Sequence, residues 1–136
     1  MFRKSPTAYL IAAPGSDELD EQTDRLRDVL DAVSVELVNQ SKRQPGGSSG
    51  DFADAFDRAD MVIADVSAAE SNPNMMFELG VARGARKPIL VLSREGAALP
   101  SDLMSLQVIT YKAEDTEKVM EYVKHWALEQ SEQITG

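Results

Sequence analysis

Short apolar runs alternate along this chain with longer amphipathic stretches, and this alternation restricts the fold more than any other feature. The runs are continuous rather than alternately apolar and polar, which is typical of strands buried on both faces of a sheet. They cover residues 8–13, 35–38, 61–64, 88–92 and 106–111. Strands that alternate with helices pair in parallel through right-handed crossovers. The sequence therefore predicts an α/β fold.

Helices are expected between and after these strands. Apolar residues at helical spacing predict an amphipathic helix over residues 17–33, and others over 52–58, 73–86 and 113–129. The apolar side of the last helix is expected to carry Val119, Tyr122, Val123 and Trp126. Five strands and four helices fit a flavodoxin-like, doubly wound parallel sheet of strand order 2-1-3-4-5, with helices on both faces.

The length of the chain suits one domain of this kind. Its 136 residues are expected to form a single domain over 1–136, with an ordered core from about residue 7 to about residue 130. A domain of this size buries roughly 68% of the surface that its unfolded chain exposes, so it needs no disulfide or metal for stability. The last residues, 134–136, are expected to fray.

Composition excludes several kinds of site. The chain has no cysteine and one histidine, His125, so thiolate chemistry and a multi-histidine metal site are excluded, and we expect neither metal nor cofactor. His125 is interpreted as an ordinary residue of a surface helix. The net charge of −9 argues against nucleic acid as a partner. Without a signal peptide or a long apolar stretch, we expect a cytoplasmic protein that contacts no membrane.

The expected topology indicates where a ligand would bind. In a doubly wound sheet, ligands bind at the carboxyl ends of the strands, where successive crossovers leave toward opposite faces. Two loops follow the first and third strands, at residues 14–17 and 65–74. Both combine small, hydroxyl or amide residues with carboxylates. They therefore suit a polar ligand.

Glu78 is the residue that most needs an explanation. Asn72 is a good N-cap and Pro73 a good first helical residue, so a helix is expected to begin there. Glu78 then lies among apolar residues on one helix face, where a lone carboxylate is costly to bury. It is interpreted as a nucleophile or general base. The alternative is that it reaches solvent or pairs with Arg83 or Arg86. The residues that share its face are Asn74, Met75, Val81, Ala82 and Ala85.

Gly80 and Gly84 lie four residues apart on the same expected helix. We interpret them as packing residues, which bring the helix close to the sheet or to a neighbouring subunit. No chemistry is assigned to them.

Three segments carry a resemblance to a known family. They are residues 60–67, 72–82 and 87–91, centred on a Glu-Leu-Gly-x-Ala helix that follows a strand ending in Ala-Asp. Here the sequence resembles the nucleoside 2-deoxyribosyltransferase-like superfamily, a relative of TIR domains. In those transferases the matching glutamate attacks the anomeric carbon of the sugar, and in TIR NADases a helix glutamate cleaves the nicotinamide–ribose bond. The resemblance implies that Glu78 is the nucleophile.

The same resemblance suggests roles for residues of both loops. Tyr9 matches a tyrosine that orients the nucleophile, although a core aromatic is the alternative. Asp65 and Ser67 are candidates for ribose contacts, with helix-entry hydrogen bonds as the alternative. Asp51 or Asp54 lies near the position of a base-contacting aspartate. The remaining expected substrate-binding residues are Gly15, Ser16, Asp17 and Asn74.

Two departures from the family pattern leave a choice of function. Asn72 stands where the transferases carry an aspartate that assists the departing base, and Ser16 is not followed by the arginine of the 5′-monophosphate hydrolases. The resemblance implies cleavage or transfer of an N-glycosidic bond in a nucleoside, nucleotide or NAD-like substrate. The alternative is a non-catalytic nucleotide-sensing or TIR-like interaction module. Either protein is expected to be bacterial and to form a dimer or larger homo-oligomer.

Overall fold

The sheet has the topology that the sequence predicts. The computed structural model describes residues 5–12, 17–39, 56–67, 73–97 and 106–135. They form a five-stranded sheet of order β2-β1-β3-β4-β5, and every strand pair is parallel. The strands are β1 (Thr7–Ala12), β2 (Glu36–Asn39), β3 (Met61–Asp65), β4 (Ile89–Arg94) and β5 (Gln107–Tyr111).

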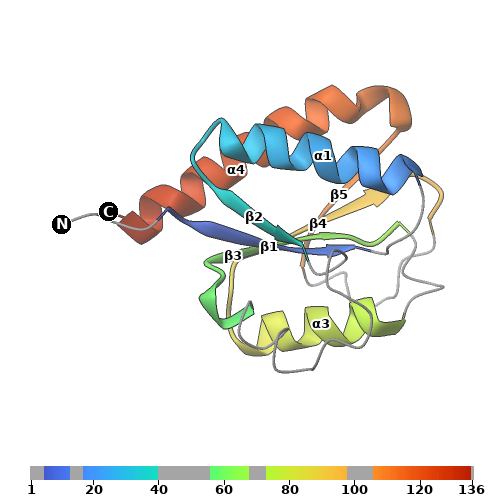
Figure 1. Cartoon of the computed structure of the whole chain (residues 1–136). Helices are drawn as coiled ribbons and strands as arrows, with labels where there is room; N and C mark the ends of the chain where they lie inside the picture. Colours follow the sequence, from blue (N-terminus) through green and yellow to red (C-terminus); the bar gives the residue numbers. More distant parts are fainter. Residues whose placement is uncertain (1–4, 13–16, 40–55, 68–72, 98–105, 136) are drawn as a thin grey trace.

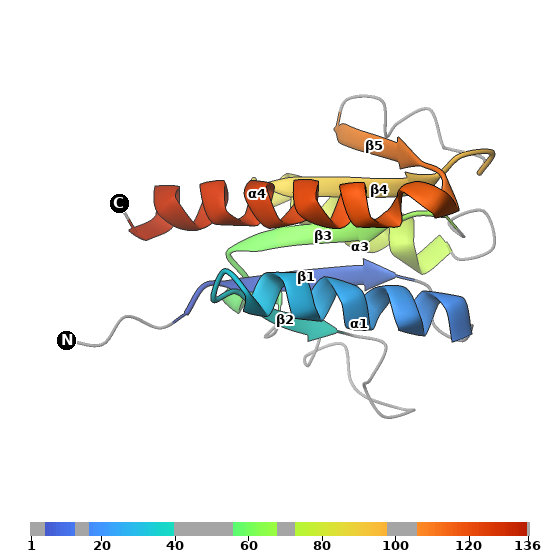
Figure 2. The same ribbon diagram turned by 90° about the horizontal axis from the view of Figure 1, so that it is seen from above.

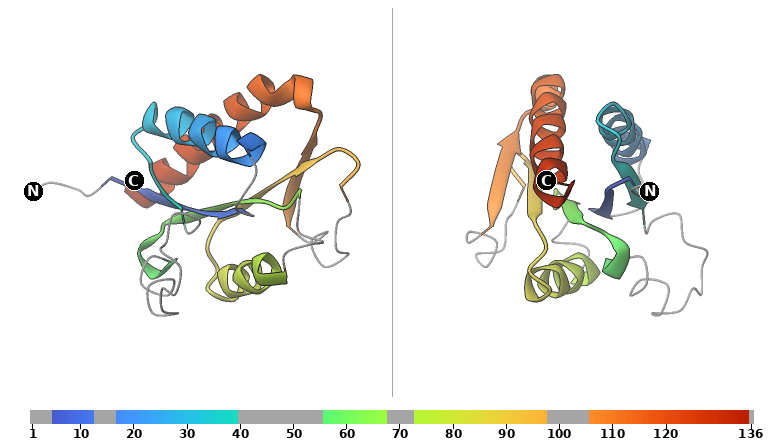
Figure 3. Two further views of the ribbon diagram at one scale, coloured as in Figure 1. Left: turned by 45° about the vertical axis from the view of Figure 1, so that its right-hand side comes forward. Right: turned by 90° about the vertical axis from the view of Figure 1, so that its left-hand side faces the viewer.

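Helices cover both faces of this sheet, as a doubly wound fold requires. One face carries α1 (Asp17–Asp31) and α4 (Thr116–Thr135), and the other carries α3 (Pro73–Gly84) (Figures 1 and 3). A 3₁₀ turn, η4 (Ala113–Asp115), precedes α4. Of the helix expected over 52–58, residues 56–58 are helical and 52–55 lie outside the described residues. Seen from above, α1 and α4 run side by side and begin at the carboxyl edge of the sheet (Figure 2).

Two apolar cores form, one on each face, and β3 contributes to both. Met61 and Ile63 pack toward α1 and α4, whereas Val62 and Ala64 pack toward α3. All five residues of β3 are buried. The continuous apolar runs of β1, β3 and β4 are therefore explained by burial on both sides.

The two edge strands differ from the expectation of burial on both faces, which is wrong for them. In β5, Gln107 and Thr110 are exposed, while Tyr111 is buried. In β2, Glu36 is exposed and Leu37 is buried. Each edge strand pairs with one described neighbour, β4 or β1. Polar side chains are accommodated in these edge strands, whereas the three central strands are almost entirely buried.

The last helix is longer than the sequence predicts. We expected it to end near residue 129 and residues 134–136 to fray, but α4 continues to Thr135. The buried Ser131 hydroxyl donates a hydrogen bond to the Ala127 carbonyl oxygen at 2.9 Å, which supports the additional turns. Tyr122 was expected in the apolar stripe, but it is 42% exposed beside the buried Val123. None of the described helices is long and apolar enough to cross a membrane.

The other two helices end earlier than expected. Instead of reaching residue 33, α1 stops at Asp31, before Ser34, which adopts a positive φ of 62°. Instead of reaching residue 86, α3 stops at Gly84, before Arg86 with a φ of 60°. A left-handed residue just beyond a helix terminates its hydrogen-bond pattern. Non-glycine residues take this role here, which is why the ends were not recognised.

The glycines of α3 do not bring that helix close to the sheet. Gly80 and Gly84 are both exposed, and a Cβ atom added to either would lie more than 4 Å from every described atom outside the helix backbone. The expectation of a close helix–sheet approach is therefore wrong. Contact with a neighbouring subunit stays a prediction.

The central position of β3 leads to a stability prediction. Ile63 is fully buried in the core between the sheet and α1 and α4. Because truncation leaves a cavity there, Ile63→Ala is expected to lower the free energy of unfolding by about 2–5 kcal/mol, and Ile63→Val by about 0.5–1.5 kcal/mol. Urea denaturation followed by circular dichroism measures both.

Ile134 provides the matched control, because it is 46% exposed near the end of α4. Ile134→Ala is expected to change the free energy of unfolding by no more than about 0.5 kcal/mol. Equal losses for the two alanine variants would contradict the placement of Ile63 in the core.

Candidate active site

Tyr9 and α3 lie on the same face of the sheet. Tyr9 is in the middle of β1, is fully buried, and meets the Phe56 ring edge-on with centroids 5.9 Å apart. Its side chain belongs to the core that Met75 and Leu79 of α3 complete. Tyr9 is therefore a core aromatic residue. Its side chain lies on the face of the sheet that packs against α3, the helix that carries Glu78.

Glu78 lies at the border of the buried stripe of α3. Met75, three residues earlier, and Ala82, four residues later, are 2% and 0% exposed, while Glu78 itself is half-buried. Phe77, the residue directly before Glu78, points toward solvent and is 67% exposed. A carboxylate in this position is partly desolvated yet accessible, which is the arrangement that a nucleophile or general base requires.

One predicted residue from each of the two loops lies at the start of a helix. Asp17 is the first residue of α1, and Asn74 is the second residue of α3. Both helices begin at the carboxyl edge of the sheet, where their N-termini favour negatively charged or polar ligand groups (Figure 1). The remaining predicted residues there lie outside the described part of the chain. They are Gly15, Ser16 and Asn72, and Asp51 and Asp54 lie outside it as well.

Asp65 occupies a different environment from Glu78. It ends β3, is 4% exposed, and accepts hydrogen bonds at both carboxylate oxygens. The Ser67 backbone N–H donates to Oδ1 at 3.0 Å, and the Tyr111 hydroxyl donates to Oδ2 at 3.4 Å. Since Tyr111 belongs to the core under α1 and α4, Asp65 faces away from α3. The structure does not bring Asp65 together with Tyr9 and Glu78.

Ser67 is likewise engaged within the protein. Its hydroxyl oxygen accepts a hydrogen bond from the Arg94 backbone N–H at 2.9 Å, which ties the segment after β3 to the end of β4. The arrangement matches the helix-entry alternative for Asp65 and Ser67, in which both residues fix the loop backbone.

A buried polar network extends from Asp65 across the carboxyl edge of the sheet. The Gln22 side-chain amide of α1 donates to the Tyr111 hydroxyl oxygen, and so does the Arg94 side chain. Burial raises the pKa of Tyr111, and the negative charge of Asp65 raises it further, whereas Arg94 and Gln22 act in the opposite direction. The network joins α1, β3, β4 and β5.

Gln22 and Tyr111 were not predicted from the sequence as parts of this edge. Gln22 had a recognisable signal, because it precedes Leu26 and Leu30 by four and eight residues on the buried face of α1. A polar residue on an apolar stripe needs a buried partner. Tyr111 gave no comparable signal, since an aromatic residue at a strand end suits any core. Among the described residues, no three acidic or histidine side chains form a group that could bind a metal ion.

Solved structures share this fold over most of their length. A 2-deoxyribosyltransferase of Bacillus psychrosaccharolyticus superposes with a TM-score of 0.66 at 15% identity, over 84% of this chain and 90% of that one. A CMP N-glycosidase of Clostridium botulinum superposes with a TM-score of 0.67 at 17% identity, over 88% and 98%. A conserved protein of Enterococcus faecalis gives 0.64 at 12% identity, over 90% and 99%. At these identities the likeness shows the fold.

The sequence itself provides the family. No curated protein matches the chain. The family model described as nucleoside 2-deoxyribosyltransferase, however, matches residues 9–132, from within β1 to nearly the end of α4. This match covers most of the 136 residues. The chain therefore belongs to the nucleoside 2-deoxyribosyltransferase family.

Proposed function

We propose that the protein cleaves or transfers the N-glycosidic bond of a nucleoside, a nucleotide or an NAD-like molecule, with Glu78 as the nucleophile. Membership in a family of nucleoside deoxyribosyltransferases supports the general chemistry, N-glycosyl transfer or cleavage on nucleosides. The observation that carries the proposal for this chain is the half-buried carboxylate of Glu78, at the edge of the α3 stripe that packs against the Tyr9 side of the sheet.

The proposed reaction has two displacement steps at the anomeric carbon. The Glu78 carboxylate attacks C1′, the C1′–N bond breaks, and its electron pair leaves with the base. A glycosyl ester of Glu78 results, which water or a second base then cleaves by attack at the same carbon. Two inversions give net retention of configuration. The Tyr9 hydroxyl is proposed to orient the carboxylate.

Asn72 restricts which leaving groups this site handles well. An amide side chain cannot donate a proton as a carboxylic acid does, so the departing base must take its proton from elsewhere or leave without one. Nicotinamide departs from NAD as a neutral molecule and needs no proton, which supports an NAD-like substrate. Pyrimidines and purines leave as anions unless they are protonated. We therefore expect release of nicotinamide to exceed release of pyrimidine bases.

Replacement of Glu78 tests the mechanism. Purified protein is incubated with a panel of nucleosides, nucleoside monophosphates and NAD, and released base is measured by chromatography. Glu78→Gln keeps the size of the side chain but removes its nucleophilic charge, so turnover is expected to fall at least about a thousandfold while the protein stays folded. Turnover at the unaltered rate in this variant contradicts the mechanism.

Glu36→Gln is the matched control. Glu36 is exposed and begins β2, at the amino end of the sheet, away from the edge where α1 and α3 begin. The same charge is removed, so an effect of net charge alone would appear in both variants. We expect Glu36→Gln to retain full turnover.

A nucleotide-sensing module is the second candidate, and Asn72 favours it. A pocket that lacks the acid of the transferases can bind a nucleotide without releasing the base. This function predicts ligand-dependent thermal stabilisation with no product, in both the native protein and Glu78→Gln. Assembly into a dimer, a cytoplasmic location and a bacterial origin stay predictions.

Asp65 is proposed to position the loop before α3 rather than to contact ribose. The proposal is supported by its burial and by the two hydrogen bonds that its oxygens accept from Ser67 and Tyr111. Tyr111→Phe removes one of these donors and leaves the Gln22 amide without its acceptor. We expect the free energy of unfolding at neutral pH to fall by about 1–3 kcal/mol.

The same variant has a predicted pH dependence. Because the folded state raises the pKa of Tyr111, its contribution to stability is complete below the ordinary tyrosine pKa of about 10 and is lost as the pH rises through the raised value. The stability difference between native protein and Tyr111→Phe is therefore expected to shrink above about pH 10. Urea denaturation at neutral and alkaline pH measures it, and a difference that grows with pH contradicts the account.

A further inference from the structure

A polar cavity opens at the carboxyl edge of the sheet, on the face opposite α3. Its volume is about 170 Å³. Residues of α1, the end of β4 and the start of α4 form its walls, so three elements far apart in sequence meet there. The lining residues are Glu21, Gln22, Arg25, Arg94, Ala113 and Thr116. None of them was assigned a role by sequence.

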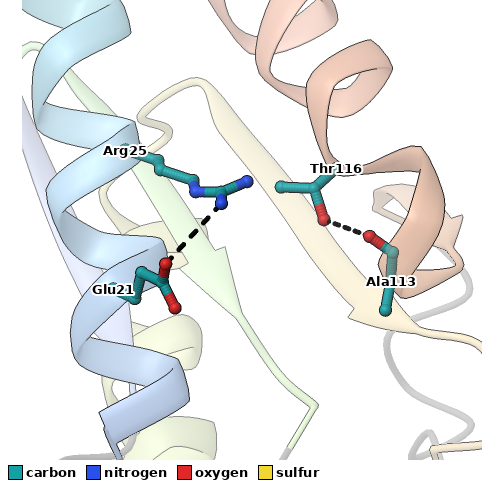
Figure 4. A network of polar contacts seen from close by, with 4 residues as sticks. All are labelled: Glu21, Arg25, Ala113 and Thr116. Carbon is teal, nitrogen blue, oxygen red and sulfur yellow. Dashed lines mark hydrogen bonds and ion pairs between the residues drawn. The ribbon is translucent and has the colours of Figure 1, made fainter.

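Two arginines from different elements give this cavity its chemistry. Arg25 extends from α1 toward Thr116 at the start of α4, across the opening between the two helices (Figure 4). Arg94 enters from the end of β4. Two guanidinium groups and one carboxylate, that of Glu21, line this small cavity, so its lining carries a net positive charge although the chain has a net charge of −9. Guanidinium groups match the oxygens of phosphate through paired N–H donors.

The Arg94 guanidinium is positioned by a hydrogen bond to the buried polar network. It donates to the Tyr111 hydroxyl, which also receives the amide of Gln22, a residue that is 7% exposed. A guanidinium carries five N–H donors in a fixed fork, so it can donate to more than one acceptor at once. A donor fixed before binding loses little conformational freedom when a ligand arrives.

Glu21 is the acid in the lining, and its pairing with Arg25 is weak. The Glu21 carboxylate and the Arg25 guanidinium are 3.6 Å apart, and the two side chains are 69% and 48% exposed. Exposed pairs of this kind contribute about 1 kcal/mol or less, because water screens them. An anion that contacts both arginines can therefore displace Glu21. The Thr116 hydroxyl already donates to the Ala113 carbonyl oxygen (Figure 4).

We propose that this cavity binds a phosphate group between Arg25 and Arg94. The group is either free phosphate or the phosphate of a nucleoside monophosphate, since both present the same oxygens. The site is separate from Glu78, because it lies on the other face of the sheet. It also adjoins the loop that leads to α3, since the Arg94 backbone N–H holds Ser67.

Titration of isotopically labelled protein tests this site without any knowledge of the substrate. Inorganic phosphate and a nucleoside monophosphate are each expected to shift the NMR resonances of Gln22, Arg25, Arg94 and Thr116. The parent nucleoside, which has no phosphate, is expected to leave them unchanged. Chloride at equal ionic strength controls for screening. Shifts with phosphate alone indicate free phosphate as the ligand, whereas tighter binding of the monophosphate indicates a nucleotide.

Arg25→Gln is the decisive variant, because Arg25 lies outside the Tyr111 network. Loss of its charged hydrogen bonds is expected to weaken phosphate binding at least about tenfold. Arg27→Gln is the matched control on the same helix, where Arg27 pairs with Asp24 at 3.5 Å and does not line the cavity. Equal weakening by both substitutions, or equal shifts with chloride, would overturn the proposal.

Glu78→Gln separates this proposal from the proposed activity. Phosphate binding between the arginines is expected to be unchanged in that variant, whatever happens to turnover. Loss of the resonance shifts in Glu78→Gln would place the phosphate in the Glu78 site and would also overturn the proposal.

Discussion

Burial of β3 on both faces is the constraint on which the rest of the molecule depends. Its five residues are all buried, and it pairs with β1 on one side and β4 on the other. The register aligns Asp65 with Ala12 and Leu92, so β1 and β3 end at one level, while β4 continues to Arg94. The first four residues of β3 are apolar, and Asp65, its last residue, is the first polar one. Asp65 therefore marks the carboxyl edge of the sheet. The cavity of the two arginines lies at that edge, and α3, the helix that carries Glu78, begins there (Figure 1).

The two faces of the sheet differ in the side chains that they present near this edge. On the side of α3, the surroundings are apolar, with Tyr9 buried below and Glu78 half-buried on the helix. On the side of α1 and α4, Gln22, Tyr111 and Asp65 form a hydrogen-bonded network beneath two arginines. A partly desolvated carboxylate suits attack on a sugar carbon, whereas fixed guanidinium groups suit an anion. The sheet keeps these two environments apart.

The sequence predicted what depends on local pattern. Continuous apolar runs indicated the strands, and their alternation with helices indicated the strand order. The role of Glu78, inferred from a carboxylate among apolar residues of one helix face, stays a prediction. The sequence did not predict the polar network, because Gln22 and Tyr111 are 89 residues apart and Tyr111 and Asp65 are 46 apart. Such contacts arise only when distant strands meet at one edge. The end of α1 was missed because Ser34 adopts a left-handed conformation, a position at which glycine is the usual residue.

The proposed mechanism requires a covalent bond between Glu78 and the sugar, and that bond can be trapped. A nucleoside that the protein turns over is supplied with fluorine at C2′, which slows cleavage of the glycosyl ester, and the protein is examined by intact mass and peptide mapping. The proposed mechanism predicts that the mass of the peptide containing Glu78 increases by that of one fluorinated sugar. No increase is expected in Glu78→Gln. A label on any other residue would contradict the account.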